Sequence, residues 1–343
     1  MEPKVSIIIP VYNAKRFVKD CLTNCIMQTM QDIEIIVVDD KSTDDTVEIV
    51  KSMMQEDDRI RLIQLDENRR QGYARNVAVE QAKADYVMFL DVDDAYREDC
   101  VEEMYKKITA DDADMTICKF DTLDDATGLI NQNQADLQLY TNFAYVDEKL
   151  YDGFIYRDLG EGEVFNKANV IWDKIYKKSF LLDNNIKFPA GMFCEDDVFS
   201  FTTLFKAKKI SVLDKSLIYY RINRVDSSSN LQDRTGFDCF RMYELVRNLL
   251  WDLNIYYRYQ YDFMMFQLYS FMFFYKYVNP KYKKEFFYRM KKELMAYKGV
   301  LDCKSYKERD AYFYDMLECI LKNNYYLYEF KKKFVNKRYN KNT

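Results

Sequence analysis

The feature that most constrains the fold is a set of short apolar runs near the start of the chain, each followed by an amphipathic segment. The runs cover residues 5–11, 33–38, 60–65, 86–90 and 114–118. They are apolar throughout, which is typical of strands covered on both faces. Amphipathic segments near 15–28, 44–56, 72–83 and 97–109 are suited to cover those faces. The pattern predicts an α/β fold with a doubly wound, mostly parallel sheet.

The sequence after these runs is less regular. Residues 121–165 lose the periodicity and gain Asn, Gln, Asp and Gly, which indicates a variable insertion or an acceptor-side loop region. The pattern resumes with a strand-like segment at 170–176, a helix at 195–206 and a strand at 210–221. We therefore expect one α/β domain over residues 1–230.

The remaining third of the chain is expected to be helical. Residues 231–343 are predicted to form an all-helical domain that is rich in aromatic side chains and ends in a basic tail. The most apolar stretch, 263–278, has 16 residues. A transmembrane helix needs about 20, so this stretch is too short to span a bilayer. No secretion signal precedes the first strand and the 8 cysteines form no C-x-x-C pair. We expect a cytoplasmic protein with reduced thiols.

Composition limits the chemistry that the chain can perform. It contains no histidine, which excludes Ser-His-Asp and Cys-His nucleophiles, His-ligated zinc and histidine as a general base. Residues 281–343 carry 17 Lys and Arg against 8 Asp and Glu, although the whole chain has a net charge of −5. The body is therefore acidic, which suits a bound cation and does not favour nucleic acid as a partner.

Acidic residues gather in three short clusters. These are Asp39-Asp40, Asp91-Val92-Asp93-Asp94 and Glu195-Asp196-Asp197. The first two follow predicted strands, at the edge of a parallel sheet where ligands bind. Carboxylates gathered there repel each other unless a cation joins them, and Mn²⁺ or Mg²⁺ prefers oxygen ligands. Each cluster alone is also compatible with a solvated turn or a charged helix start.

The sequence offers no standard phosphate-binding loop. Neither G-x-x-x-x-G-K-[ST] nor G-x-G-x-x-G occurs. A helix N-terminus supplies only about half a positive charge, so a divalent ion at Asp91 and Asp93 would contribute more toward a diphosphate. Arg75, Arg221 and Arg224 are candidates for additional cations near the phosphates.

Seven motifs occur in an order and spacing that are specific when taken together. They are VSIIIPVYNA (5–14), IEIIVVDDKSTDDT (33–46), NRRQGYARN (68–76), YVMFLDVDD (86–94), VIWDKIYKKSFL (170–181), FCEDDVF (193–199) and YYRINRVDSSS (219–229). Over about residues 4–230 the chain thereby resembles the family-two inverting glycosyltransferases of the GT-A fold, of the bacterial surface-polysaccharide type.

This resemblance implies roles for residues of the donor side. Pro10 and Tyr12 would border the nucleotide, and Asp40 would accept a hydrogen bond from the nucleobase, which is uracil in many members. Asn68 and Arg75 would line the donor pocket. A UDP-sugar is therefore the expected donor.

The resemblance also implies roles around the reacting atoms. Asp93 would bind the metal directly, and Asp91 would face the ribose or the waters of the metal. The general base of the family corresponds to Asp196, with Asp197 as the alternative. Such a carboxylate takes the proton of the acceptor hydroxyl, while a divalent cation stabilises the leaving diphosphate.

One motif departs from the family pattern. Members often carry histidine near the R-x-x-S loop that closes over the diphosphate, and this chain has none. Arg224 or Arg221 would have to serve there. The expected enzyme is a hexosyl- or N-acetylhexosaminyltransferase that acts on a glycan or lipid-linked glycan.

Three alternatives remain open from the sequence. The run before Asp91 also resembles the nucleophile strand of haloacid-dehalogenase-type phosphatases, although it comes fourth in strand order and Asp94 stands where Thr or Val is usual. A catalytically inactive nucleotide-sugar-binding subunit is a second possibility. The basic end, 331–343, is either an ordinary solvated tail or a peripheral contact with anionic membrane.

Overall fold

The computed structural model describes residues 2–131, 150–152, 165, 170–224, 234–302, 307–308 and 310–339. Much of the predicted insertion at 121–165 therefore lies outside the described residues, as do Ser227 of the R-x-x-S motif and the end of the basic tail. The chain divides into two compact units, Met1–Ser227 and Ser228–Thr343.

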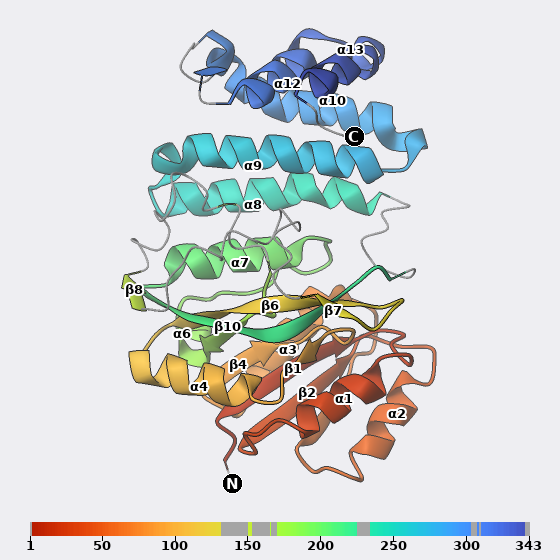
Figure 1. Ribbon diagram of the computed structural model, residues 1–343, viewed down its shortest axis with the longest axis vertical. Coiled ribbons are helices and arrows are strands. Elements are labelled where there is room, and N and C mark those ends of the chain that lie inside the picture. The colour runs from red at the N-terminus through yellow and green to blue at the C-terminus, as the bar shows by residue number, and fades with distance from the viewer. Residues whose placement is uncertain are drawn as a thin grey trace. The chain divides into compact units, whose positions relative to one another are not determined.

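The first unit is built on one mixed sheet (Figure 1). Its strands are β1 (Val5–Val11), β2 (Ile33–Asp39), β3 (Ile60–Gln64), β4 (Tyr86–Phe89), β5 (Ala95–Tyr96), β6 (Met115–Asp124), β7 (Ile130–Asn131), β8 (Leu150–Asp152), β9 (Lys174–Lys177) and β10 (Lys209–Ile222). The order along the sheet is β3-β2-β1-β4-β9-β6-β10-β5. Strands β1 to β4 run parallel, as do β6 and β10, whereas β9 is antiparallel to both β4 and β6.

Helices cover both faces of this sheet. They are α1 (Val18–Ile26), α2 (Thr46–Met53), α3 (Arg70–Gln81), α4 (Cys100–Asp111), α6 (Lys178–Asp183) and α7 (Glu195–Lys206). On one face, Ile7 and Ile9 of β1 belong to the same core cluster as Leu22 of α1 and Met104 of α4. On the other face, the ring of Phe89 in β4 lies 5.6 Å from that of Phe199 in α7. This two-sided burial explains why the strands are apolar throughout.

One predicted strand begins later than the sequence indicates. The pattern predicts a strand over 170–176, but β9 begins at Lys174. The carbonyl of Val170 is used by side chains instead of a strand ladder: it accepts hydrogen bonds from Lys174 Nζ at 2.5 Å and from Ser200 Oγ at 2.9 Å. The fully buried Asp173 carboxylate pairs with the same ammonium at 2.6 Å.

The second unit is helical in its described residues. It contains η3 (Thr235–Phe237), α8 (Asp238–Asp252), α9 (Tyr256–Tyr277), η4 (Pro280–Tyr282), α10 (Lys283–Leu294), η5 (Met295–Asp302), α12 (Ala311–Lys322) and α13 (Tyr325–Arg338). Aromatic rings contribute to its core. The centre of the Phe240 ring, for example, lies 4.9 Å from the ring centres of both Phe271 and Phe286. In the described part of the chain, no helix has the length and apolarity required to cross a bilayer.

Candidate active site

The predicted donor residues of the first two strands lie at the carboxyl edge of the sheet. Pro10 is buried near the end of β1, where it no longer pairs with β4 because that pairing ends at Ile8 and Phe89. Proline lacks an N–H donor, so its position beyond the β1–β4 ladder is favourable, while in the β1–β2 ladder it lies opposite Val38. Tyr12 follows β1 and is 51% exposed. Its ring is therefore available to a ligand at this edge.

Asp40 is a buried carboxylate at the same edge. It follows β2, and its Oδ1 accepts the backbone N–H of Arg69 at 2.7 Å. Burial raises the pKa of Asp40 despite that hydrogen bond. Asp39 has a different role, since its carboxylate accepts the N–H of Ser42 at 3.1 Å and so holds the turn after β2. Asn68 lies before α3 and is exposed.

Arg75 connects two acidic clusters that are far apart in the sequence. It lies on α3 with its side chain 1% exposed. One guanidinium nitrogen pairs with Asp91 after β4 at 2.6 Å, and the other pairs with Glu195 at the start of α7 at 2.8 Å. Because Glu195 directly precedes Asp196, this side chain ties the segment after β4 to the predicted base. Arg75 is buried and already holds two carboxylates, so in the described structure it acts as the ion-pair partner of both acidic clusters.

Two further arginines hold the acidic segment after β4. The backbone N–H of Arg221 on β10 donates to Asp94 Oδ1 at 2.8 Å, and its Nε donates to the carbonyl of Asp93 at 2.7 Å. The guanidinium of Arg224 forms an ion pair with the Asp93 carboxylate. Burial and the negative charge of Asp91 nevertheless raise the pKa of Asp93. The ion pair with Arg224 therefore does not offset the effect of burial and of Asp91 on this carboxyl.

These arginines belong to a cationic group that the sequence did not reveal. The guanidinium carbons of Arg16, Arg221 and Arg224 lie 4.7, 5.5 and 5.5 Å from the centre of the Phe17 ring. Asp125 pairs with Arg16 at 2.8 Å and with Arg221 at 3.1 Å. Arg16 and Phe17 come after the first motif with only Lys15 between, so their nearness to VSIIIPVYNA was the available signal. An anionic ligand at this edge would meet several cations.

Asp196 has the properties expected of a base at neutral pH. Burial, followed by the charge of Glu195, raises the pKa of Asp196 to about 7, while Arg75 acts in the opposite direction. Its Oδ1 accepts the N–H of Asp197 at 3.0 Å. Burial also raises the pKa of Asp197, but there the principal charges are Asp196 and Glu195. Asp196 is thus the member of this pair that is electrostatically coupled to Arg75 and the donor side.

The approach of α3 to α7 depends on a glycine. A Cβ atom at Gly72 would lie 2.7 Å from Glu195 Cγ and 3.2 Å from the carbonyl oxygen of Pro189. Any larger residue would displace the carboxylate that positions Arg75. The glycine lies within the NRRQGYARN motif, but its packing role could not be inferred from the motif alone.

An aromatic pair lies beside the acidic segment. Trp172 stacks on Tyr220 of β10, with ring centres 5.2 Å apart and planes inclined by 12°. Burial and the charges of Asp94, Asp91 and Asp93 raise the pKa of Tyr220 to about 12. Trp172 is 4% exposed, so its role in the described structure is that of a buried packing residue.

The acidic segment after β4 offers oxygen atoms to a cation. The Asp94 Oδ2 atom is buried without a hydrogen-bond partner, and Asp91 remains 32% exposed. These oxygen donors fit a hard divalent cation. Within the described ranges, however, no group of three or more acidic or cysteine side chains is arranged around one point. A cation would therefore need ligands from a bound phosphate or water as well.

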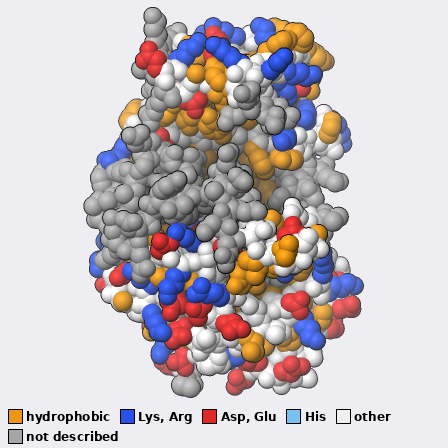
Figure 2. Space-filling model, in the orientation of Figure 1, with side chains coloured by type: hydrophobic (Ala, Val, Ile, Leu, Met, Phe, Trp, Pro, Cys, Tyr) orange, Lys and Arg blue, Asp and Glu red, His pale blue; other side chains and the backbone are white. Residues whose placement is uncertain are grey.

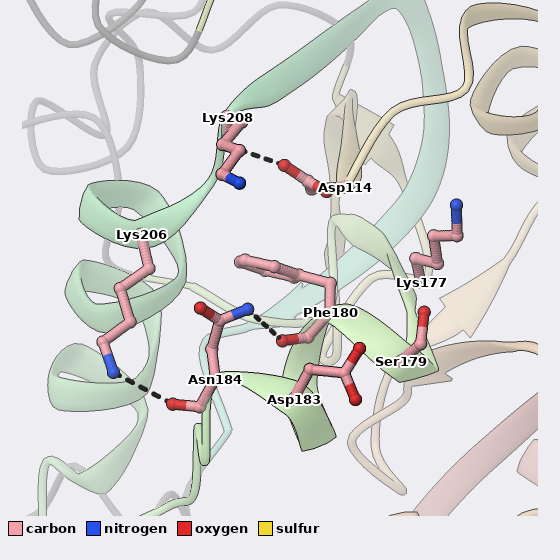
Figure 3. Close-up of a pocket in the computed structure, with 8 residues that line it drawn as sticks. All are labelled: Asp114, Lys177, Ser179, Phe180, Asp183, Asn184, Lys206 and Lys208. Atoms are coloured by element: carbon pink, nitrogen blue, oxygen red, sulfur yellow. Dashed lines mark hydrogen bonds between the residues drawn. The ribbon is translucent and has the colours of Figure 1, made fainter.

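A cavity of about 180 Å³ lies elsewhere in the first unit (Figure 3). It is lined by residues near the starts of β6 and β10, the end of β9, and α6 and α7, and none of the predicted site residues is among them. Several of its polar groups are already engaged: Lys206 Nζ donates to the carbonyl of Asn184 at 3.0 Å, and the N–H of Lys208 donates to Asp114 at 2.7 Å. This cavity is not the candidate active site.

Comparisons with known proteins agree with the motifs. Residues 6–173 match the model of glycosyl transferase family 2. The chain is 33% identical over 227 residues to glycosyltransferase GlyA of Streptococcus pneumoniae, covering 65% of this chain but 31% of that protein. It is 31% identical over 253 residues to the uncharacterized glycosyltransferase YibD of Escherichia coli, covering 73% of this chain and 71% of that protein.

A solved structure has the same fold. Residues 1–349 of TarS from Staphylococcus aureus, in complex with UDP-GlcNAc, superpose with a TM-score of 0.73 at 22% identity, covering 98% of this chain and 91% of that chain. The predicted α/β sheet with a helical C-terminal region is thereby confirmed. Together with the sequence matches, this places the chain in glycosyl transferase family 2.

Proposed function

We propose that the protein transfers a hexosyl or N-acetylhexosaminyl group from a UDP-sugar to a hydroxyl of a glycan or lipid-linked glycan, with inversion and with a divalent cation. The observation that carries this proposal is the double ion pair of Arg75. It links Asp91, on the side of the sheet expected to hold the donor, to Glu195 beside the proposed base. Donor and acceptor chemistry would thus share one rigid site.

The proposed reaction is a single displacement. The Asp196 carboxylate accepts the proton of the acceptor hydroxyl, the acceptor oxygen forms a bond to the anomeric carbon, and the bond from that carbon to the diphosphate oxygen breaks. UDP leaves with the electron pair. A pKa of about 7 allows Asp196 to be ionised at neutral pH and still to bind the transferred proton effectively.

On the donor side, the uracil would meet Asp40 and Tyr12, beside Pro10 and Asn68. Asp93 and Asp91 would hold Mn²⁺ or Mg²⁺ together with the phosphates. The cation would supply Lewis-acid stabilisation to the leaving diphosphate. Because Arg224 pairs with Asp93 in the described structure, we propose that its guanidinium turns from that carboxylate to the phosphates when the donor binds. The UDP-GlcNAc complex of TarS, which has the same fold, supports UDP as the nucleotide.

A named relative bears on the acceptor, and the charge of the chain end bears on the location. The TarS relative is named a poly(ribitol-phosphate) β-N-acetylglucosaminyltransferase, which favours a bacterial surface polymer or its lipid-linked precursor as the acceptor class. We propose that the protein works in the cytoplasm, at the inner face of the membrane, with the basic residues of 331–343 in peripheral contact with anionic lipid.

The phosphatase alternative loses support. A phosphatase nucleophile at Asp91 would have to attack a phosphoryl group, but Asp91 is held by Arg75 at 2.6 Å and the chain belongs to another family. An inactive nucleotide-sugar-binding subunit would share the same fold. It would bind UDP yet release none from any UDP-sugar.

Calorimetric titration with UDP tests the donor and the cation together. The wild-type protein should bind UDP with Mn²⁺ present and lose most of that affinity in EDTA. Asp93→Asn should lower the affinity in Mn²⁺ to the level seen in EDTA. Asp99→Asn, whose carboxylate pairs with Arg97 away from the site, is the matched control and should bind UDP normally. Equal affinity with and without Mn²⁺ would refute the cation role, and no binding in either condition would refute UDP as the nucleotide.

A further inference from the structure

Helix α13 of the second unit leaves an apolar stripe uncovered. Tyr326, Leu327, Phe330 and Phe334 are 68, 40, 62 and 60% exposed. The opposite side of the helix packs inward, because Tyr328 is 2% exposed and its ring lies 4.8 Å from that of Phe287 in α10. Large aromatic side chains are rarely left exposed side by side without a binding partner.

The stripe is continuous along the helix. Tyr326, Phe330 and Phe334 are spaced by four residues, which places them on one face, and Leu327 borders the same face. The rings of Phe330 and Phe334 are in contact, with centres 5.2 Å apart. We call this set the aromatic stripe.

Lysines border the aromatic stripe. Three lysines of α13 are exposed: Lys331, Lys333 and Lys337. Successive residues of a helix are rotated by about 100° around its axis, which places these lysines beside the aromatic positions. No ion pair joins these three ammonium groups to another described residue. The acidic residue of the helix, Glu329, is engaged elsewhere, since it accepts a hydrogen bond from Lys332 Nζ at 2.8 Å and from the hydroxyl of Tyr275.

Figure 2 shows side chains of several kinds on the visible surface of the second unit, acidic ones among them. Lys and Arg side chains lie beside hydrophobic ones over the part of the second unit that Figure 1 labels α12 and α13. Exposed aromatic side chains beside exposed lysines, on a face without a free acid, suit contact with an anionic lipid interface.

We propose that the aromatic stripe of α13 and its bordering lysines form a docking surface for an anionic lipid bilayer. The rings would enter the boundary between headgroups and acyl chains, and the ammonium groups would meet lipid phosphates. This inference rests on the proposed function in one respect, because it brings the enzyme to a lipid-linked acceptor. It also extends the membrane contact proposed for the basic chain end, because α13 would make apolar contacts through its rings as well as electrostatic contacts through its lysines.

Charge favours lipid over a second copy of the chain as the occupant. Two copies that met through this face would bring Lys331, Lys333 and Lys337 of one chain close to the same residues of the other. Like charges at such close range oppose association, whereas an anionic bilayer neutralises them. The surface is therefore complementary to lipid and not to itself.

Flotation of the full chain with phosphatidylcholine vesicles, with and without phosphatidylglycerol, tests the proposal. The wild-type protein should float with the anionic vesicles and remain unbound with phosphatidylcholine alone at ordinary salt. Phe330→Ser with Phe334→Ser should weaken partitioning to anionic vesicles at least about tenfold. Lys331→Gln with Lys333→Gln should weaken it about fivefold per lysine.

Matched controls separate this face from general surface effects. Lys19→Gln with Lys51→Gln removes the same charge from exposed positions of the first unit, and Tyr257→Ser removes an aromatic ring that is 77% exposed on α9. Both controls should partition as the wild type does. Partitioning that survives the Phe pair and the Lys pair, or that falls equally in the controls, would overturn the proposal.

A gain-of-signal variant locates the helix in the bilayer. In Phe330→Trp, anionic vesicles should shift the added tryptophan emission to the blue, and lipids brominated on their acyl chains should quench it. An unshifted, unquenched signal would place residue 330 outside the bilayer and refute docking through the stripe. If instead sedimentation shows self-association that the Phe pair abolishes, the occupant is a second copy and the proposal fails.

The failure of this inference is distinguishable from failure of the proposed function. Every variant should bind UDP with Mn²⁺ as the wild type does, because α13 lies in the second unit and carries none of the proposed donor residues. Vesicle binding without UDP binding would refute the proposed donor alone, and the reverse would refute the docking surface alone.

Discussion

Replacing Arg75 by Met should destabilise the first unit strongly, because it removes a charge shared by two carboxylates. The Arg75 and Glu195 side chains are only 1 and 2% exposed, so water cannot compensate Glu195. The Asp91 side chain is 32% exposed and can regain solvent. Methionine fills much of the same volume, so the loss of charge is the main change.

The magnitude follows from which carboxylate is left buried. Breaking a buried ion pair from one side costs about 3–5 kcal/mol, whereas a partly exposed pair contributes at most about 1 kcal/mol. For Arg75→Met we expect a loss of about 3–5 kcal/mol, or roughly 10 °C in melting temperature for a unit of this size. Adding Glu195→Gln removes the uncompensated charge, so the double variant should be more stable than Arg75→Met alone.

Tryptophan fluorescence can follow the first unit by itself. The chain has two tryptophans, and Trp172 is 4% exposed in the first unit while Trp251 lies in α8 of the second. In a Trp251→Phe background, the emission of Trp172 on heating reports the unit that contains Arg75. Arg97→Met is the matched control, because that side chain is 37% exposed and pairs at the surface. It should cost less than about 1 kcal/mol.

Two results would refute this reasoning. One is an Arg75→Met variant that melts within about 2 °C of Arg97→Met, which would mean that the buried pair contributes no more than a surface pair. The other is a double variant with Glu195→Gln that is no more stable than Arg75→Met alone. In that case Glu195 would not be the carboxylate that the guanidinium compensates.

Three further predictions concern UDP release and UDP binding. The pKa of Asp196 is raised to about 7, and its ionised form is the proposed base. The rate of UDP release from a sugar donor should therefore fall about tenfold per pH unit below 7 and level off above it. A rate that stays constant across neutral pH would contradict this prediction. Gly72→Ala places a Cβ 2.7 Å from Glu195 Cγ and should lower the rate of UDP release severalfold. In the control Gly299→Ala the added Cβ meets nothing within 4 Å, so its rate should match the wild type. Equal rates for the two variants would mean that a glycine is not needed at position 72. Arg224→Met should weaken UDP binding about tenfold by calorimetry, and unchanged affinity would remove that residue from the phosphates.

The elements that the sequence predicted well are those with strong patterns. The apolar runs of the parallel strands become β1 to β4, and the acidic start with an amphipathic continuation becomes α7 at Glu195–Lys206. Burial on both faces imposes such patterns, so they can be read without a structure. Strand β9 is short and antiparallel, and the carbonyl before it is used by the Lys174 side chain, which no periodicity records.

The predicted site was accessible from the sequence only in part. Acidic clusters at strand ends could be predicted because the ends of parallel strands meet at one edge. The pairing of Arg75 with Glu195 joins residues 120 positions apart, and the grouping of Arg16 with Arg224 on the Phe17 ring also depends on tertiary contacts. The exposed face of α13 could not be predicted either. Aromatic residues lie on many helix faces of the second unit, and the sequence does not show which of these faces is buried.

The central claim is that Asp196 is the base of a UDP-sugar-dependent transfer. Its most direct test is the rate of UDP release from a panel of UDP-sugars by the wild type, by Asp196→Asn and by Asp197→Asn, with UDP affinity measured for each. We predict that Asp196→Asn binds UDP normally but releases it about 10²- to 10⁴-fold more slowly, while Asp197→Asn retains most of the rate. Wild-type turnover by Asp196→Asn, with Asp197→Asn inactive, would contradict the claim and assign the base to the neighbouring carboxylate.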